Sequence, residues 1–125
     1  MIKILLLIGS GSFLGGISRY LTSRYIQENV LSVFPFGTFT VNILGCFLIG
    51  VIYALSERAD FMSVETRMFL TAGFCGGFTT FSTFSNESLA LLRDGNILFV
   101  ALYAGGSVIL GILATYLGTL IVNTF

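Results

Sequence analysis

Histidine and tryptophan are absent from the 125 residues, proline occurs once, and charged side chains make up only 10% of the chain. The lack of histidine removes the commonest metal ligand and the commonest proton shuttle. Six basic and six acidic residues give a net charge of zero, and no basic run indicates nucleic-acid binding. Hydrolysis is also disfavoured, because no apolar segment carries a histidine or a pair of carboxylates. We therefore expect a protein that is not an enzyme.

Apolar residues are abundant instead: they make up 55% of the chain, and the mean hydropathy is +0.96. A membrane span needs about 20 apolar residues. Long uncharged intervals predict helices at about residues 3–25, 37–56, 67–92 and 96–123. The expected fold class is an all-α membrane protein with four transmembrane helices, forming a single transmembrane domain over residues 1–125.

The first apolar segment follows Lys3 and could also be a secretory signal peptide. Its glycine-rich continuation through Arg19 to Tyr25 has no clean small-residue cleavage site, so we expect a retained helix. The only two cysteines, Cys46 and Cys75, fall inside expected spans. We expect both to be free, buried thiols.

Three smaller features concern packing and helix ends. Gly11 and Gly15 have the spacing that lets another backbone come close to the first helix. Glu28 is expected to lie in the short connection before the second helix. Asp60 or Ser63 is the expected N-cap of the third helix.

Residues 73–87 lie inside an apolar segment, yet their composition interrupts a helix. Three glycines within residues 73–77 weaken helical propensity, and hydroxyl side chains then alternate with phenylalanines. Broken backbone at membrane depth is tolerated only where protein or a water-filled cavity covers it. We therefore expect the third helix to be broken in the middle of the membrane, with its freed backbone groups forming an ion or solute site.

Polar side chains on two other helices could reach this stretch. Thr38, Asn42 and Gly45 share one face of the second helix. Asn42 could donate to an anion or could make a purely structural interhelical hydrogen bond. Tyr103 and Ser107 begin a small, partly polar stripe on the last helix, where they could line a pathway or simply pack.

A second polar stripe follows the expected break, formed by Thr80, by Thr83 or Phe84, and by Glu87. Phe81 and Phe84 lie beside it, and the edges of their rings are electropositive. Ring edges next to hydroxyl and amide donors form a weakly electropositive lane, which suits an anion that must also be released. Ordinary packing of the two rings is the alternative.

Basic residues are nearly balanced between the two ends of the expected spans. The end with both termini holds Lys3, Arg58 and Arg67, and the other holds Arg24, Arg93 and, at its edge, Arg19. Orientation follows the excess of Lys and Arg, so this balance predicts insertion both ways and an antiparallel, dual-topology homodimer. A weakly biased single orientation is the alternative. Arg19 lies within a span and either reaches the interface or faces water.

Three blocks of the sequence closely resemble the signatures of the CrcB/Fluc family of bacterial fluoride ion channels. They are GGISRY at 15–20, GTFTVNILG at 37–45 and GFCGGFTTFSTF at 73–84. The resemblance spans all four expected helices, and the third block is its most specific part. Gly16 departs from the family, which usually has Ala there.

The resemblance implies a fluoride-selective channel that exports fluoride passively and confers fluoride resistance. It implies an antiparallel homodimer with two pores in the bacterial plasma (inner) membrane. Phe81 and Phe84 would contact fluoride through their ring edges, and Asn42 would donate nearby. The remaining implied pathway residues are Thr38, Ser82, Thr83, Tyr103 and Ser107, with Glu87 near one pore end and Arg19 at a vestibule.

The resemblance also implies one cofactor, a structural Na⁺ at the dimer centre. Its ligands would be the backbone carbonyls of Gly76 and Thr79 from both subunits. Oxygen-only ligation suits a hard monovalent cation.

Two other functions fit four short helices. A small dual-topology multidrug exporter would use an acidic residue in its first helix to couple protons to the drug, but the first span here has none. A non-transporting membrane assembly protein would use the glycines for packing alone.

Overall fold

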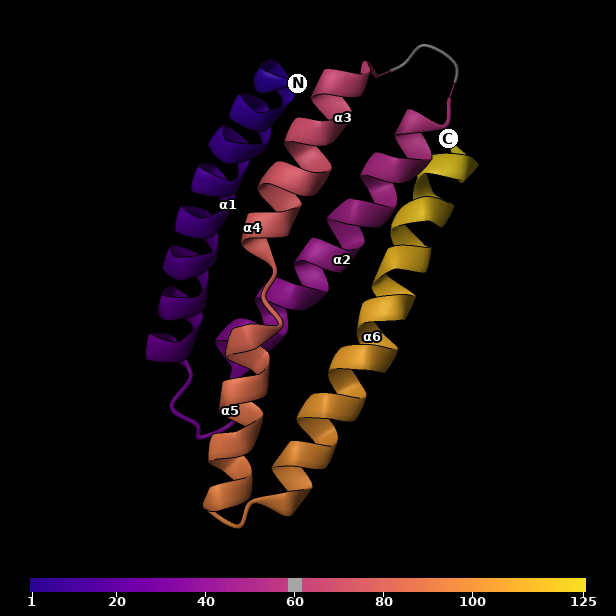
Figure 1. The fold of residues 1–125 in the computed structure, drawn as a ribbon. Coiled ribbons are helices and arrows are strands. Elements are labelled where there is room, and N and C mark those ends of the chain that lie inside the picture. The colour runs from indigo at the N-terminus through magenta and orange to yellow at the C-terminus, as the bar shows by residue number, and fades with distance from the viewer. Residues whose placement is uncertain (59–61) are drawn as a thin grey trace.

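The computed structural model describes residues 1–58 and 62–125, and this part of the chain is all-helical (Figure 1). Its three long helices are α1 (Ile2–Asn29), α2 (Phe36–Ser56) and α6 (Ile97–Thr124). A run of shorter elements lies between α2 and α6. It consists of α3 (Val64–Met68), the π-helix η1 (Phe69–Cys75), α4 (Gly76–Phe78) and α5 (Ser82–Arg93).

The three long helices are each long and apolar enough to cross a membrane. Leu, Ile, Val and Phe cover much of their outer surfaces, where lipid rather than water must surround them. The expected all-helical, multi-pass membrane fold is therefore confirmed. Figure 1 shows both chain ends at the same end of the bundle, as an even number of crossings requires.

Two helix boundaries differ from those expected. The first helix continues past residue 25 to Asn29, so Glu28 lies in α1 and not in the connection. Glu28 is paired with Arg24 one turn earlier, with Nε and Oε1 2.7 Å apart, and such i,i+4 pairs favour the helix. The third helical run begins at Val64, where Ser63 Oγ accepts from the Thr66 N–H at 3.1 Å. Ser63 is thus the N-cap, while the alternative, Asp60, lies outside the described residues.

Glycines let α1 pack backbone to backbone against η1 and α4. A Cβ atom on Gly11 would lie 2.5 Å from the Phe69 carbonyl oxygen, and one on Gly15 would overlap the carbonyl of Phe74. From the other side, a Cβ on Gly73 would lie 3.0 Å from the Cα of Gly11. The close approach predicted from the spacing of Gly11 and Gly15 is confirmed.

The same contacts revise the interpretation of the glycines at 73–77 as the place where the helix breaks. Gly73 lies within η1, and Gly76 and Gly77 lie within α4. A Cβ on Gly77 would meet the Ser12 carbonyl oxygen at 2.6 Å, so this glycine is required for contact with α1. The interruption comes later, at residues 79–81.

α2 and α6 form the other closely packed pair. A Cβ on Gly50 would overlap the carbonyl of Thr115, and one on Gly118 would overlap that of Phe47. Thr115 Oγ1 donates to the Cys46 carbonyl at 3.0 Å, which ties the two helices at the same level. Small residues at a helix crossing allow this proximity.

The two sides of the interruption have different neighbours. Among the described residues, α1 packs on α3, η1 and α4 but not on α5, whereas α6 packs on α5 but not on α4. α2 contacts both sides. Figure 1 shows the interruption about half-way along the bundle, between α4 and α5.

Candidate functional site

The interruption of the helix is held open by one side chain of α2. Thr79 has extended backbone angles, φ −92° and ψ 157°. Asn42 Oδ1 accepts from the Thr80 N–H at 2.9 Å, and Asn42 Nδ2 donates to the Thr80 carbonyl at 3.0 Å. One amide thus satisfies both main-chain groups of Thr80, which would otherwise be left without partners in an apolar bundle.

Two backbone donors are diverted at this point from the acceptors that a continuous helix would give them. The Thr80 N–H, which would bond to Gly76, bonds to Asn42. The Thr83 N–H, which would bond to Thr79, bonds to Thr80 Oγ1 at 3.2 Å. The carbonyl oxygens of Gly76 and Thr79 are therefore released from their usual helical donors.

Gly76 differs from the neighbouring glycines in its surroundings. It is exposed, and the nearest atom to a Cβ placed on it is the Thr71 carbonyl oxygen at 3.6 Å. Packing within the chain therefore does not explain a glycine here. No cluster of three or more His, Cys, Asp or Glu that could hold a metal occurs in the described ranges, so a cation at this place would depend on backbone oxygens.

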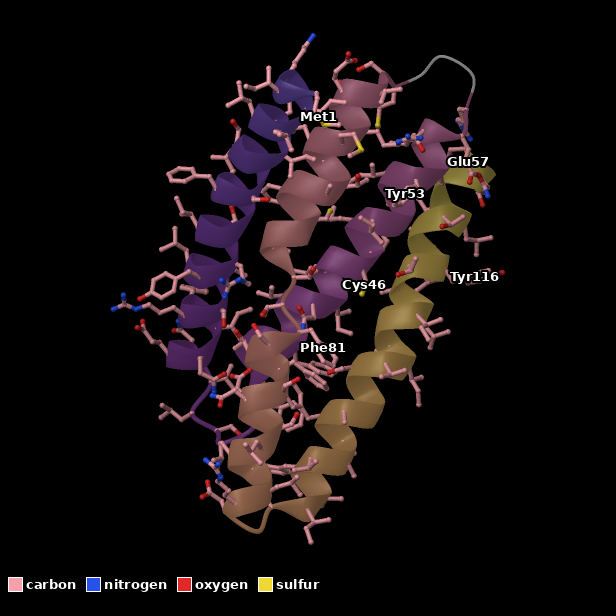
Figure 2. The ribbon with its side chains drawn as sticks, in the orientation of Figure 1. Met1, Cys46, Tyr53, Glu57, Phe81 and Tyr116 are labelled. Atoms are coloured by element: carbon pink, nitrogen blue, oxygen red, sulfur yellow. The ribbon has the colours of Figure 1, made fainter. Side chains whose placement is uncertain are left out.

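A pocket of about 410 Å³ opens beside the interruption. Its walls come from α2, η1, α4, the interruption, α5 and α6, and include Asn42, Cys46, Gly76, Thr79, Phe81, Phe84 and Ser107. Phe81 is 78% exposed. Figure 2 shows Phe81 at the level of the interruption, on the side that faces α6. The structure thus brings several of the residues named from the sequence to one hollow.

Rings and a carboxylate continue from the pocket towards the α5–α6 end. The Phe81 and Phe84 ring centroids are 5.6 Å apart, and those of Phe84 and Tyr103 are 4.8 Å apart. Tyr103 is fully buried and donates its hydroxyl to Glu87 Oε1 at 3.1 Å. The two phenylalanines, the tyrosine and the carboxylate therefore form one continuous line.

Hydroxyl groups accompany this line. Thr80 Oγ1 lies 3.2 Å from Thr83 Oγ1 and 3.5 Å from Ser82 Oγ. Thr38 is buried in the first turns of α2. The Ser107 hydroxyl oxygen is buried and has no hydrogen-bond partner within the part of the chain that the structure describes. Ser107 therefore offers a free donor at the wall of the pocket.

Arg19 neither extends to the end of α1 nor enters the pocket. Its Nε donates to the Gly77 carbonyl at 3.3 Å, and the residue is half-buried. The guanidinium therefore lies on the α1 side of α4, across from the pocket. This contact with the main chain is a third way to place an arginine within a span, beyond the two expected from the sequence.

Thr80 is the residue that the structure adds to those implied by the resemblance. Its main chain pairs with Asn42 and its hydroxyl accepts from the Thr83 N–H. The only signal in the sequence was its place in the hydroxyl-rich run. Its partner is 38 residues away, so local pattern does not reveal the pairing.

Fold and site together define a small multi-pass helical membrane protein with a polar site beside an interrupted helix. A family profile described as "CrcB-like protein, Camphor Resistance (CrcB)" matches residues 6–119. The chain belongs to this family.

Curated relatives are similar over nearly the whole length. "Fluoride-specific ion channel FluC" of Chlorobium chlorochromatii is 53% identical over 91% of this chain and 88% of the relative. The protein of the same name from Phocaeicola vulgatus is also 53% identical, over 93% of this chain and 95% of its own. That from Bacteroides fragilis is 48% identical over 92% and 91%. The relatives are named as channels, in agreement with the prediction that the chain is not an enzyme.

Proposed function

We propose that this chain is a fluoride-selective ion channel that exports fluoride passively across the bacterial inner membrane and so confers fluoride resistance. The observation that carries the proposal is the 53% identity, over 91% of the chain, to a relative named as a fluoride-specific ion channel. The geometry is compatible with this function, because the residues implied by the resemblance gather at one interruption of a membrane helix.

The chemistry of the site favours a small anion that passes through without being trapped. The edges of Phe81 and Phe84 and the hydroxyl of Ser107 present weak positive charge to the pocket. α5 begins beside the pocket at Ser82, and the amino end of a helix favours anions. Conduction needs sites weak enough to release the ion, and none of the pocket walls carries a lysine or arginine.

We further propose that two copies pair in opposite orientations, so that the second copy closes the pathway. A single chain leaves Phe81 78% exposed and the pocket open on one side. Irregular backbone at mid-membrane depth must be covered by protein or water. The balanced basic residues at the two ends remove the main determinant of a single orientation.

Gly76 and Thr79 would hold a structural Na⁺ between the two copies. Their carbonyl oxygens lack their usual helical donors, and Gly76 leaves space where any other residue would place a Cβ. Neutral oxygen ligands suit a hard monovalent cation. The ion would supply attraction between two interrupted helices and would take no part in conduction.

Purified protein in liposomes loaded with potassium fluoride tests the proposed function. Fluoride should leave when a potassium ionophore is added, because the ionophore removes the opposing voltage, and a fluoride electrode measures the release. Chloride release should be far slower. Release no faster than from empty liposomes would reject the channel, and proton-driven drug uptake would point instead to the exporter.

Orientation is tested separately with reporter tags on the C-terminus. Tags should be accessible from both sides of the membrane. Accessibility from one side only would contradict dual insertion while leaving conduction untouched.

A further inference from the structure

The side-chain amide of Gln27 clamps the connection between α1 and α2. Its Nε2 donates to the carbonyls of Ser32 at 3.1 Å and Phe34 at 3.3 Å. Its Oε1 accepts from the Gly37 N–H in the first turn of α2, at 3.1 Å. One side chain thus bonds to three main-chain groups and fixes the path of the connection relative to α1.

The helices leave little freedom at this clamp. A Cβ on Gly37 would lie 2.5 Å from the Ser23 carbonyl oxygen and 2.6 Å from Ser23 Oγ. Ser23 is on α1, one turn before Gln27. The first turn of α2 is therefore pressed against α1, and a change in the hydrogen bonds of Gln27 must displace the connection.

Phe34 carries the clamp into the interior of the bundle. Its ring is 8% exposed and meets Phe39 of α2 at a centroid distance of 5.7 Å, with the ring planes at 74°. It meets Phe99 and Tyr103 of α6 at 5.6 Å each, with angles of 85° and 75°. Edge-to-face contacts of this kind define the orientation of each ring as well as its distance.

Tyr103 connects this aromatic cluster to the proposed pathway. Its ring is 5.6 Å from Phe34 on one side and 4.8 Å from Phe84 on the other. Its hydroxyl donates to Glu87. A shift of Phe34 would therefore move the tyrosine relative to both groups, since packed rings do not move independently.

We propose that Gln27 is a positioning residue for the fluoride pathway, acting through Phe34 on the ring and hydroxyl of Tyr103. This inference rests on the proposed function and extends it to a residue that does not line the pocket at the interruption. Gln27 does not contact the ion. It holds the wall against which the pathway is built.

Fluoride efflux from liposomes tests the inference with two variants. Gln27→Met keeps the length of the side chain and removes all three hydrogen bonds, while Gln27→Glu removes the donor nitrogen alone. Both should slow initial efflux by about tenfold, because small displacements of positioned groups have large effects on rate. Elution volume and the midpoint of thermal unfolding should stay close to those of the parent chain.

Asn29→Ala is the matched control. Asn29 lies on the same end of α1, but its amide donates to the Tyr25 carbonyl of its own helix and is exposed. Its removal should leave efflux unchanged.

A double variant distinguishes positioning from a separate effect. If Gln27 acts through Phe34, the pair Gln27→Met and Phe34→Leu should conduct no more slowly than Phe34→Leu alone. Multiplied losses, unchanged efflux in both Gln27 variants, or aggregation of both would overturn the inference. Failure of the parent chain to release fluoride would reject the proposed function itself, so the two failures can be told apart.

Discussion

The two parts of the interrupted helix are held in opposite ways. η1 and α4 meet α1 through main-chain atoms, because Gly11, Gly15 and Gly73 remove the side chains that would separate them. α5 meets α6 through side chains, chiefly the Phe84–Tyr103 ring contact and the Tyr103–Glu87 hydrogen bond. Backbone contact tolerates no added atom, whereas side-chain contact leaves room for chemistry. The polar line of the site accordingly lies on the α5 part.

Gly15→Val would break the comparison on the α4 side and should have the largest effect. The new side chain would overlap the Phe74 carbonyl, which cannot move without moving η1. Overpacking of this kind costs about 3 kcal/mol at the upper end of its usual range. We expect little monodisperse protein on size exclusion and a strongly lowered unfolding midpoint.

Gly9→Val is its control, because a Cβ on Gly9 has no atom within 4 Å. It should yield normally folded protein. Equal behaviour of the two variants would mean that the α1 contact is not set by the glycines.

Phe81→Ile should sharpen the comparison, since it changes conduction without changing stability. The ring is 78% exposed in the single chain, so its loss costs little packing there. Loss of an electropositive ring edge from a preorganised site should slow fluoride efflux by about a hundredfold. Phe84→Ile should slow efflux as well, and dimers should persist in both.

The matched control is Phe13→Ile on α1, whose ring is 67% exposed and distant from the interruption. Its efflux should equal that of the parent chain. Normal efflux in both Phe81→Ile and Phe84→Ile would refute their proposed contact with fluoride.

Asn42→Ala tests the joint between the two parts, with a smaller effect than the first variant. It leaves the N–H and carbonyl of Thr80 without their partner. Unsatisfied buried backbone groups should destabilise the fold by about 2 kcal/mol, measured by denaturant or thermal unfolding. Asn29→Ala removes an exposed amide and should have no effect. A fully stable Asn42→Ala variant would show that the interruption does not depend on this amide.

Much of the fold was predictable from local pattern. Long uncharged intervals indicated α1, α2 and α6, and the spacing of Gly11 and Gly15 indicated a close helix contact. These properties depend on residues within one helix. The sequence therefore carries them directly.

The details of the site were less predictable, because they depend on residues far apart in the chain. The glycines at 73–77 suggested a break, yet the helix continues through them and is interrupted where Asn42 pairs with Thr80. The contact of Arg19 with the Gly77 carbonyl joins residues 58 apart. Such pairings follow from the packing of α1 and α2 against the interrupted run, which no periodicity encodes.

The interruption also bears on how the chain enters the bilayer during synthesis. The 12 residues of α5 reach about 18 Å, well short of a hydrocarbon core of about 30 Å. This segment cannot act as an independent stop for the insertion machinery. It must be delivered as a hairpin with α6, onto α1 and α2 already in place, so a nascent chain truncated before residue 97 should be left with a dangling, protease-sensitive tail.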